Sequence, residues 1–122
     1  MNIDRASNLL SPGESAIVLF TREPPGGSDD KFHIRPDKSG WSGNWARSGN
    51  YQADKVIIYY RPPWRGPNYG EIFMARYEDT VPSPLPGRDR IKFRGAEQVG
   101  TTTQNWLEFA GKGQTPTGLI SR

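Results

Sequence analysis

The sequence predicts a single small α+β domain in which short strands outweigh helices. The chain has 122 residues, which is the length of one typical domain. Its 14 glycines and 11 prolines make up about a fifth of the chain, against roughly 12% in an average protein, and this excess disfavours a helical bundle. Several β-branched and aromatic runs lie between turn signals, as strands do. Four Trp, five Tyr and five Phe supply large side chains for a core.

Both ends of the chain are predicted to be loosely attached. Residues 1–10 favour a short helix, which would end at the proline and glycine that follow it. Residues 1–14 form an N-terminal arm in this prediction. Residues 112–122 are polar and include Pro116, so we expect a frayed tail or a junction with a longer protein.

Five runs predict strands, at residues 15–21, 31–34, 55–61, 71–79 and 89–96. The third run (KVIIYYR) is apolar on both faces and is therefore expected inside the sheet. It should form a hairpin with the fourth run (EIFMARYED). In the fifth run, Arg90, Lys92 and Arg94 alternate with apolar residues, which predicts a half-buried strand with one basic face.

The remaining segments are predicted to be loops, apart from one helix. Polar or proline-rich composition predicts loops at residues 23–30, 35–52, 62–70 and 81–87. Thr101 and Gln104 have the spacing of a capping box, which predicts a helix from about residue 102 to residue 110. Gly111 should close that helix in a left-handed conformation. Trp106 lies on its apolar face and is expected in the core.

Positive charge gathers where aromatic residues lie in predicted loops. The formal net charge is only +3, but residues 31–65 hold seven cations against Asp37 and Asp54, a net of +5. A second basic block spans residues 81–122, with six cations against three anions. Eleven of the sixteen cations are Arg, which contacts phosphate through two parallel hydrogen bonds and stacks on bases. An anionic partner is therefore expected.

No arrangement of catalytic or metal-binding residues emerges from the sequence. The absence of Cys excludes thiol nucleophiles, disulfides and Cys-based zinc sites. His33 is the only His and has no nucleophile beside it. Glu71 and Glu78 would lie about 20 Å apart along a strand, too far for paired carboxylate chemistry. We predict no enzymatic activity, no metal and no cofactor.

No apolar run is long enough for a signal peptide or a membrane span. Together with the absence of Cys, this predicts a cytoplasmic protein without membrane contact.

The residues favour a binding function. Trp41, Trp45, Trp64 and Tyr69 lie in the two loops that flank the strand at residues 55–61. Flat aromatic rings beside arginines are the groups needed to stack a base and hold its phosphates. The predicted phosphate contacts are Arg47, Arg61, Arg65, Arg90, Lys92 and Arg94. For Trp41, Trp45 and Trp64, a place in the core is equally compatible with the sequence.

Several runs resemble the EVE and YTH branch of the PUA-like superfamily. They are GNWAR at residues 43–47, DKVIIYY at 54–60, GEIFMAR at 70–76 and RIKF at 90–93. The resemblance covers roughly residues 15–100 and implies a small mixed β-barrel with short flanking helices. Members of that branch flip a modified base, methyladenine in RNA or modified cytosine in DNA, into an aromatic cage.

By this resemblance Trp45 would be the first wall of the cage. The second Trp of the YTH pattern should follow the strand at residues 71–79, and residues 81–87 contain no aromatic residue. Either Trp41, Trp64 or Tyr69 supplies the second wall, or the pocket holds something other than methyladenine.

The resemblance implies a monomeric reader of a modified base, with DNA favoured over RNA. Such modules often serve modification-dependent restriction or defence systems, fused to or associated with a nuclease or motor. An alternative from a different class is a protein-interaction or phage-type accessory domain with exposed Trp and Arg as its hot spot. A small hydrolase of unfamiliar type is a third alternative.

Overall fold

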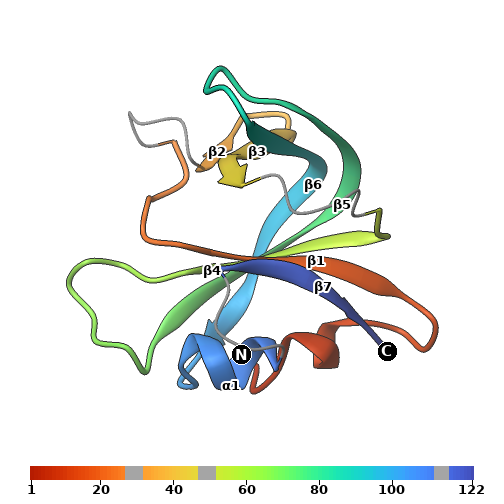
Figure 1. The fold of residues 1–122 in the computed structure, drawn as a ribbon. Helices are drawn as coiled ribbons and strands as arrows, with labels where there is room; N and C mark the ends of the chain where they lie inside the picture. The colour runs from red at the N-terminus through yellow and green to blue at the C-terminus, as the bar shows by residue number, and fades with distance from the viewer. Residues whose placement is uncertain (27–31, 47–51, 112–115) are drawn as a thin grey trace.

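The computed structural model describes residues 1–26, 32–46, 52–111 and 116–122, which form a seven-stranded mixed sheet with two short helices (Figure 1). The order in the sheet is β2-β3-β6-β5-β4-β1-β7. The strands are β1 (Ser15–Thr21), β2 (Phe32–Ile34), β3 (Gly40–Ala46), β4 (Lys55–Tyr60), β5 (Gly70–Pro82), β6 (Arg88–Thr102) and β7 (Thr117–Ser121). The helices are the 3-10 helix η1 (Ala6–Leu9) and α1 (Trp106–Ala110). The chain is therefore a small α+β domain.

Strand β4 lies inside the sheet, as predicted. It pairs in parallel with β1 and antiparallel with β5. Val56 and Ile58 belong to one buried cluster, whereas Ile57 and Tyr59 belong to the cluster on the other face. Both faces of β4 are thus covered, which explains why its sequence is apolar without alternation.

The sheet is not closed into a barrel, and the expectation of a barrel is wrong. Strands β2 and β7 stand at the two ends of the sheet order. Strand β7 pairs with the free edge of β1, so no strand from the other end of the sheet can pair there and close a barrel. Register shifts between β5 and β6 bend these long strands. Phe32 of β2 and Phe93 of β6 lie in the same buried cluster as Leu19 of β1. The sheet is therefore strongly curved, so that strands far apart in its order share a core, but it stays open.

The segment predicted as a polar loop at residues 35–52 contains strand β3. This strand pairs with β2 on one side and β6 on the other. Small residues and Trp build it, so the aliphatic run that usually marks a strand is missing. Gly40 allows the close approach of β2, because a side chain there would meet the backbone of His33.

Strand β6 is also longer than predicted, with 15 residues. It continues beyond the predicted end at residue 96, and Gly95, at φ 65°, lies where its pairing with β5 is irregular. The long β5–β6 ribbon links the two halves of the molecule in Figure 1, with β2 and β3 at one end and the helices at the other.

Both ends of the chain are packed, in contrast to the expected loose arm and tail. Ile3, Ala6 and Leu10 are buried in the cluster on the helix side of the sheet. The backbone N–H of Ile3 donates to the carbonyl of Thr101 at 2.8 Å. At the other end, Thr117–Ser121 form β7, while residues 112–115 lie outside the described residues.

Helix α1 begins four residues later than predicted. Asn105 caps it by accepting a hydrogen bond from the backbone N–H of Glu108 at 2.9 Å, so the Thr101–Gln104 capping box is wrong. Gly111 ends the helix in the left-handed conformation at φ 67°, as predicted. Trp106 is buried, which confirms its expected place in the core.

Candidate nucleic-acid interface

The candidate interface is one face of the half-sheet formed by β2, β3, β6 and the second half of β5. Along β6, Ile91 and Phe93 are buried. Since successive side chains of a strand point to opposite faces, Arg90, Lys92 and Arg94 lie on the other side. The predicted basic face of this strand is thus present.

Cations from neighbouring elements join those of β6. Arg76 of β5 is in register with Arg94, and Trp41 of β3 is in register with Lys92. A hollow of about 540 Å³ lies on this side of the sheet, and Asp37 and Glu78 are part of its lining. Its lining also includes five cations: Arg35, Lys38, Arg76, Lys92 and Arg94. We use the term cationic face for Arg35, Lys38, Arg76, Arg90, Lys92 and Arg94.

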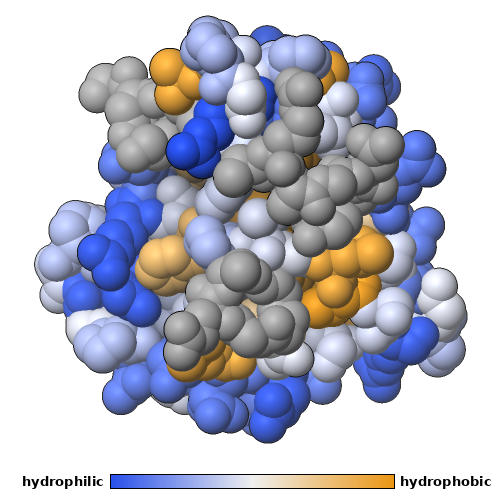
Figure 2. Space-filling view, in the orientation of Figure 1, coloured by the Kyte–Doolittle hydropathy of each residue, from blue (hydrophilic) through white to orange (hydrophobic). Residues whose placement is uncertain are grey.

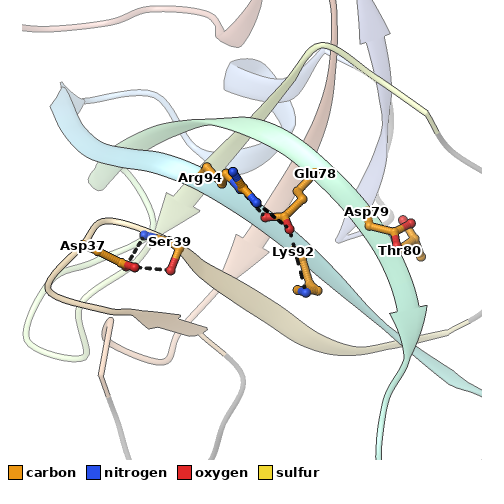
Figure 3. Close-up of polar contacts among 7 residues, drawn as sticks. All are labelled: Asp37, Ser39, Glu78, Asp79, Thr80, Lys92 and Arg94. Atoms are coloured by element: carbon orange, nitrogen blue, oxygen red, sulfur yellow. Dashed lines mark hydrogen bonds and ion pairs between the residues drawn. The ribbon is translucent and has the colours of Figure 1, made fainter.

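Glu78 holds two cations of this face in place (Figure 3). Nε of Arg94 donates to Oε2 of Glu78 at 2.9 Å, and Nζ of Lys92 lies 3.9 Å from Oε1. The hydrogen bond from Arg94 lowers the pKa of Glu78 and raises the pKa of Arg94 itself. One carboxylate therefore partly neutralises two cations, and both remain on the surface.

The turn between β2 and β3 projects Lys38 toward the same hollow. Asp37 accepts hydrogen bonds from the backbone N–H and hydroxyl of Ser39, at 3.0 and 2.6 Å, which lower its pKa (Figure 3). This bracing accompanies a left-handed conformation of Lys38, at φ 68°. Lys38 forms an ion pair with Glu97 of β6, and this pairing lowers the pKa of Glu97.

Trp41 is half-buried among cationic and aromatic groups. The guanidinium carbons of Arg35 and Arg90 lie 5.0 and 4.8 Å from the centroid of its ring. The ring of His33 lies 4.7 Å away at an angle of 31°. Because both arginines contact its π system, Trp41 orients cations of the face.

Trp45 is placed at the border of the core. Its indole N–H donates to the buried hydroxyl of Ser42 at 3.0 Å, and its ring packs against the cluster that contains Phe93. The hydrogen bond satisfies the polar atoms of both residues. Trp45 and Trp41 share strand β3, but a register shift between Ser42 and Trp45 places Trp45 on the core side of the sheet, opposite the face of Trp41.

The structure does not bring Trp64 and Tyr69 to Trp41 and Trp45. Trp64, 74% exposed, and Tyr69 lie in the loop between β4 and β5, which enters β5 where Gly70 pairs with Thr102. Trp41 pairs with Lys92, which lies ten residues before Thr102 on β6. Ten residues span roughly 33 Å along a strand. The four predicted cage residues thus occupy two separate regions.

The predicted phosphate contacts divide in the same way. Arg90, Lys92 and Arg94 belong to the cationic face, whereas Arg61 and Arg65 belong to the region of Trp64 and Tyr69. Arg47 lies outside the described residues.

Three residues of the cationic face were missed by the sequence reasoning: Arg35, Lys38 and Arg76. Arg35 and Lys38 join it only through the pairing of β2 with β3, and β3 had no strand signal in the sequence. Arg76 did have a signal, because it follows the buried Ala75 in a predicted strand and must therefore point outward.

Within the described residues, no group of three or more His, Asp or Glu side chains is arranged to hold a metal ion. None of the helices in this part of the chain is long and apolar enough to cross a membrane.

Fold and site together define a small α+β domain with an open mixed sheet and a cationic face on one half of it. Comparisons with protein-family models, with curated proteins and with solved structures find no match to this chain.

Proposed function

We propose that the protein is a nucleic-acid-binding module that contacts phosphates through the cationic face. The observation that carries this proposal is the direct opposition of Arg76 and Arg94 on neighbouring strands, with Lys92 and Arg35 lining the same hollow. Like charges that face each other across strands are destabilising, so their gathering favours an anionic partner. Among the described residues, neither Arg35 nor Arg76 has a carboxylate within ion-pair distance.

The form of the face also supports a polymer as the partner. The cations come from the β2–β3 turn, β5 and β6, so they spread over a broad open surface. Phosphates of a strand lie several ångströms apart and need such spread contacts. At the edge of the face, the ring of Trp41 holds the guanidinium groups of Arg35 and Arg90 on this surface.

Reading of a modified base stays a prediction. At this face it depends on Trp41 alone, since Trp45 packs against the buried cluster on the other side of the sheet and Trp64 and Tyr69 lie elsewhere. Binding of Trp45→Ala to oligonucleotides with and without methylated cytosine or methylated adenine tests this point. An unchanged preference for the modified strand would exclude Trp45 as a cage wall.

The proposed function is tested by fluorescence anisotropy with labelled DNA and RNA strands of about twelve nucleotides. We expect binding that weakens steeply between about 50 and 200 mM salt, because phosphate contacts release counterions. Affinity that does not change with salt, or no binding at the lower salt concentration, would contradict the proposal.

One observation favours the second candidate, a protein-interaction domain. Trp64 is 74% exposed on a loop with Pro62, Pro63 and Pro67, and exposed Trp is typical of hot spots. For this candidate Trp64→Ala should abolish partner binding with little dependence on salt, whereas nucleic-acid binding should remain.

A further inference from the structure

The carboxyl ends of the two parallel strands form a second concentration of arginine, far along the sheet from the cationic face. Strands β1 and β4 are paired up to Thr21 and Tyr60, so Arg22 and Arg61 leave the sheet side by side. The backbone N–H of Arg61 donates to the carbonyl of Thr21 at 3.0 Å, which fixes this junction. Figure 2 shows strongly hydrophilic residues on this side of the molecule, at the left of the view.

Both arginines converge on the ring of Phe20. The guanidinium carbons of Arg61 and Arg22 lie 4.9 and 5.9 Å from its centroid. Phe20 in turn contacts the rings of Tyr59 and Trp106, each with centroids less than 6 Å away. Two positive charges therefore lie against a cluster of aromatic rings, which attracts cations but carries no negative charge to neutralise them.

No carboxylate of the described residues lies within ion-pair distance of Arg22 or Arg61. The Nε of Arg61 is buried and has no hydrogen-bond partner in the part of the chain that the structure describes. Two neighbouring guanidinium groups without a carboxylate partner are the arrangement that binds phosphate through several charge-assisted hydrogen bonds.

Two adjoining hollows meet at this pair. A hollow of about 510 Å³ is lined by Arg22 and Arg61 together with Phe20, Trp106 and Asn105 of the helix side. A hollow of about 330 Å³ on the other side is lined by the same two arginines and by Arg65 with prolines of the β4–β5 loop. Arg65 is held over the ring of Tyr69, with 3.9 Å between its guanidinium carbon and the centroid. Among the residues that the structure describes, no Asp or Glu lines either hollow.

We propose that Arg22, Arg61 and Arg65 bind the phosphate of a phosphate monoester, and that the larger hollow holds a planar ring attached to it. A nucleoside 5′-monophosphate has this chemistry, either as a free molecule or as the 5′-phosphorylated end of a strand. The volume of the larger hollow lies in the range of small-molecule sites, which are mostly apolar with a few polar groups that fix orientation. This site is independent of the phosphate contacts of the cationic face.

The test is calorimetric titration of the whole chain with adenosine 5′-monophosphate, adenosine and inorganic phosphate. We expect the monophosphate to bind at least about tenfold more tightly than either of the others. Adenosine equal to the monophosphate would overturn the role of the arginines, and inorganic phosphate equal to it would overturn the ring site. No binding of the monophosphate at about 10 mM would overturn the proposal as a whole.

Variants locate the site. Arg61→Gln and, at an exposed position, Arg22→Gln should each weaken monophosphate binding at least about tenfold. Arg94→Gln on the cationic face is the matched control, and it should leave this binding unchanged. Equal binding by the wild type and both pocket variants would contradict the assignment.

Two further measurements distinguish the sources of the phosphate. Competition of the monophosphate against a 5′-phosphorylated strand, but not against a 5′-hydroxyl strand, would identify a strand end as the ligand. Failure to compete with either strand would identify a free mononucleotide. Because Arg94→Gln reports on the cationic face separately, either proposal can fail while the other holds.

Discussion

Arg94 of β6 and Glu78 of β5 are joined by a hydrogen bond of 2.9 Å, and the same carboxylate lies 3.9 Å from Lys92. Glu78 thus contacts two cations of the cationic face. It limits the positive potential of the surface to which we assign nucleic-acid binding. Removal of its charge should consequently strengthen that binding.

Glu78→Gln should raise the affinity for a single strand by a factor of about three to five, since two cations become free to contact phosphate. The affinity should also fall more steeply with salt. Anisotropy titrations at several salt concentrations measure both effects. Glu108→Gln, which removes an equal charge from α1, is the control, and an equal gain in both variants would show only an effect of net charge.

Stability in acid should depend on Glu78 in a defined direction. Its pKa in the folded state is lowered, first by the hydrogen bond from Arg94. Its contribution is therefore complete above the ordinary glutamate pKa and is lost as the pH falls through the lowered folded value. Denaturant unfolding of wild type and Glu78→Gln from about pH 7 to about pH 3 should show a difference that shrinks in acid. A difference that grows toward low pH would contradict the assigned shift.

Gly70→Ala should destabilise the fold through the core. An added Cβ would lie 2.6 Å from Cζ of Tyr59, which is buried and donates its hydroxyl to the carbonyl of Gln104 at 2.8 Å. We expect a loss of about 1–3 kcal/mol in the free energy of unfolding. Gly66→Ala in the preceding loop has open space around it and should change stability by less than about 0.5 kcal/mol. Similar unfolding curves for the two variants would refute this packing.

Asn105→Ala should weaken α1 at its start. The side chain of Asn105 satisfies the backbone N–H of Glu108, and its loss should cost about 1 kcal/mol in thermal or chemical unfolding. Asn105→Asp retains the acceptor and is the matched control. A neutral effect of the alanine variant would mean that water replaces the cap without cost.

The strands with a strong hydrophobic signal could be predicted from the sequence. Residues 15–21 and 55–61 gave β1 and β4 because buried strands need β-branched and aromatic residues on both faces. Strand β3 had no such signal, since it is built of Gly, Ser, Asn and Trp and depends on pairing with β2 and β6. Pairing between distant segments is a tertiary effect that local composition does not carry.

The candidate site shows the same limit. The alternation of Arg90, Lys92 and Arg94 was predictable because it follows from the two-residue period of a strand. The proximity of Arg35 and Arg76 to these residues depends on the sheet order and could not be read from the sequence. In the sequence, the segments that contain Trp41 and Trp64 lie directly before and after β4. In the fold, they lie at opposite ends of the long β5–β6 ribbon.

Binding by the cationic face is tested most directly by an NMR titration of the ¹⁵N-labelled protein with a single-stranded oligonucleotide. We expect the largest amide shifts on β2, β3 and the paired parts of β5 and β6, and we expect Lys92→Gln and Arg94→Gln to reduce affinity. Arg5→Gln, which removes the same charge near η1, should leave affinity almost unchanged. Amide shifts confined to the β4–β5 loop and α1, or an equal loss of affinity in all three variants, would contradict binding by the cationic face.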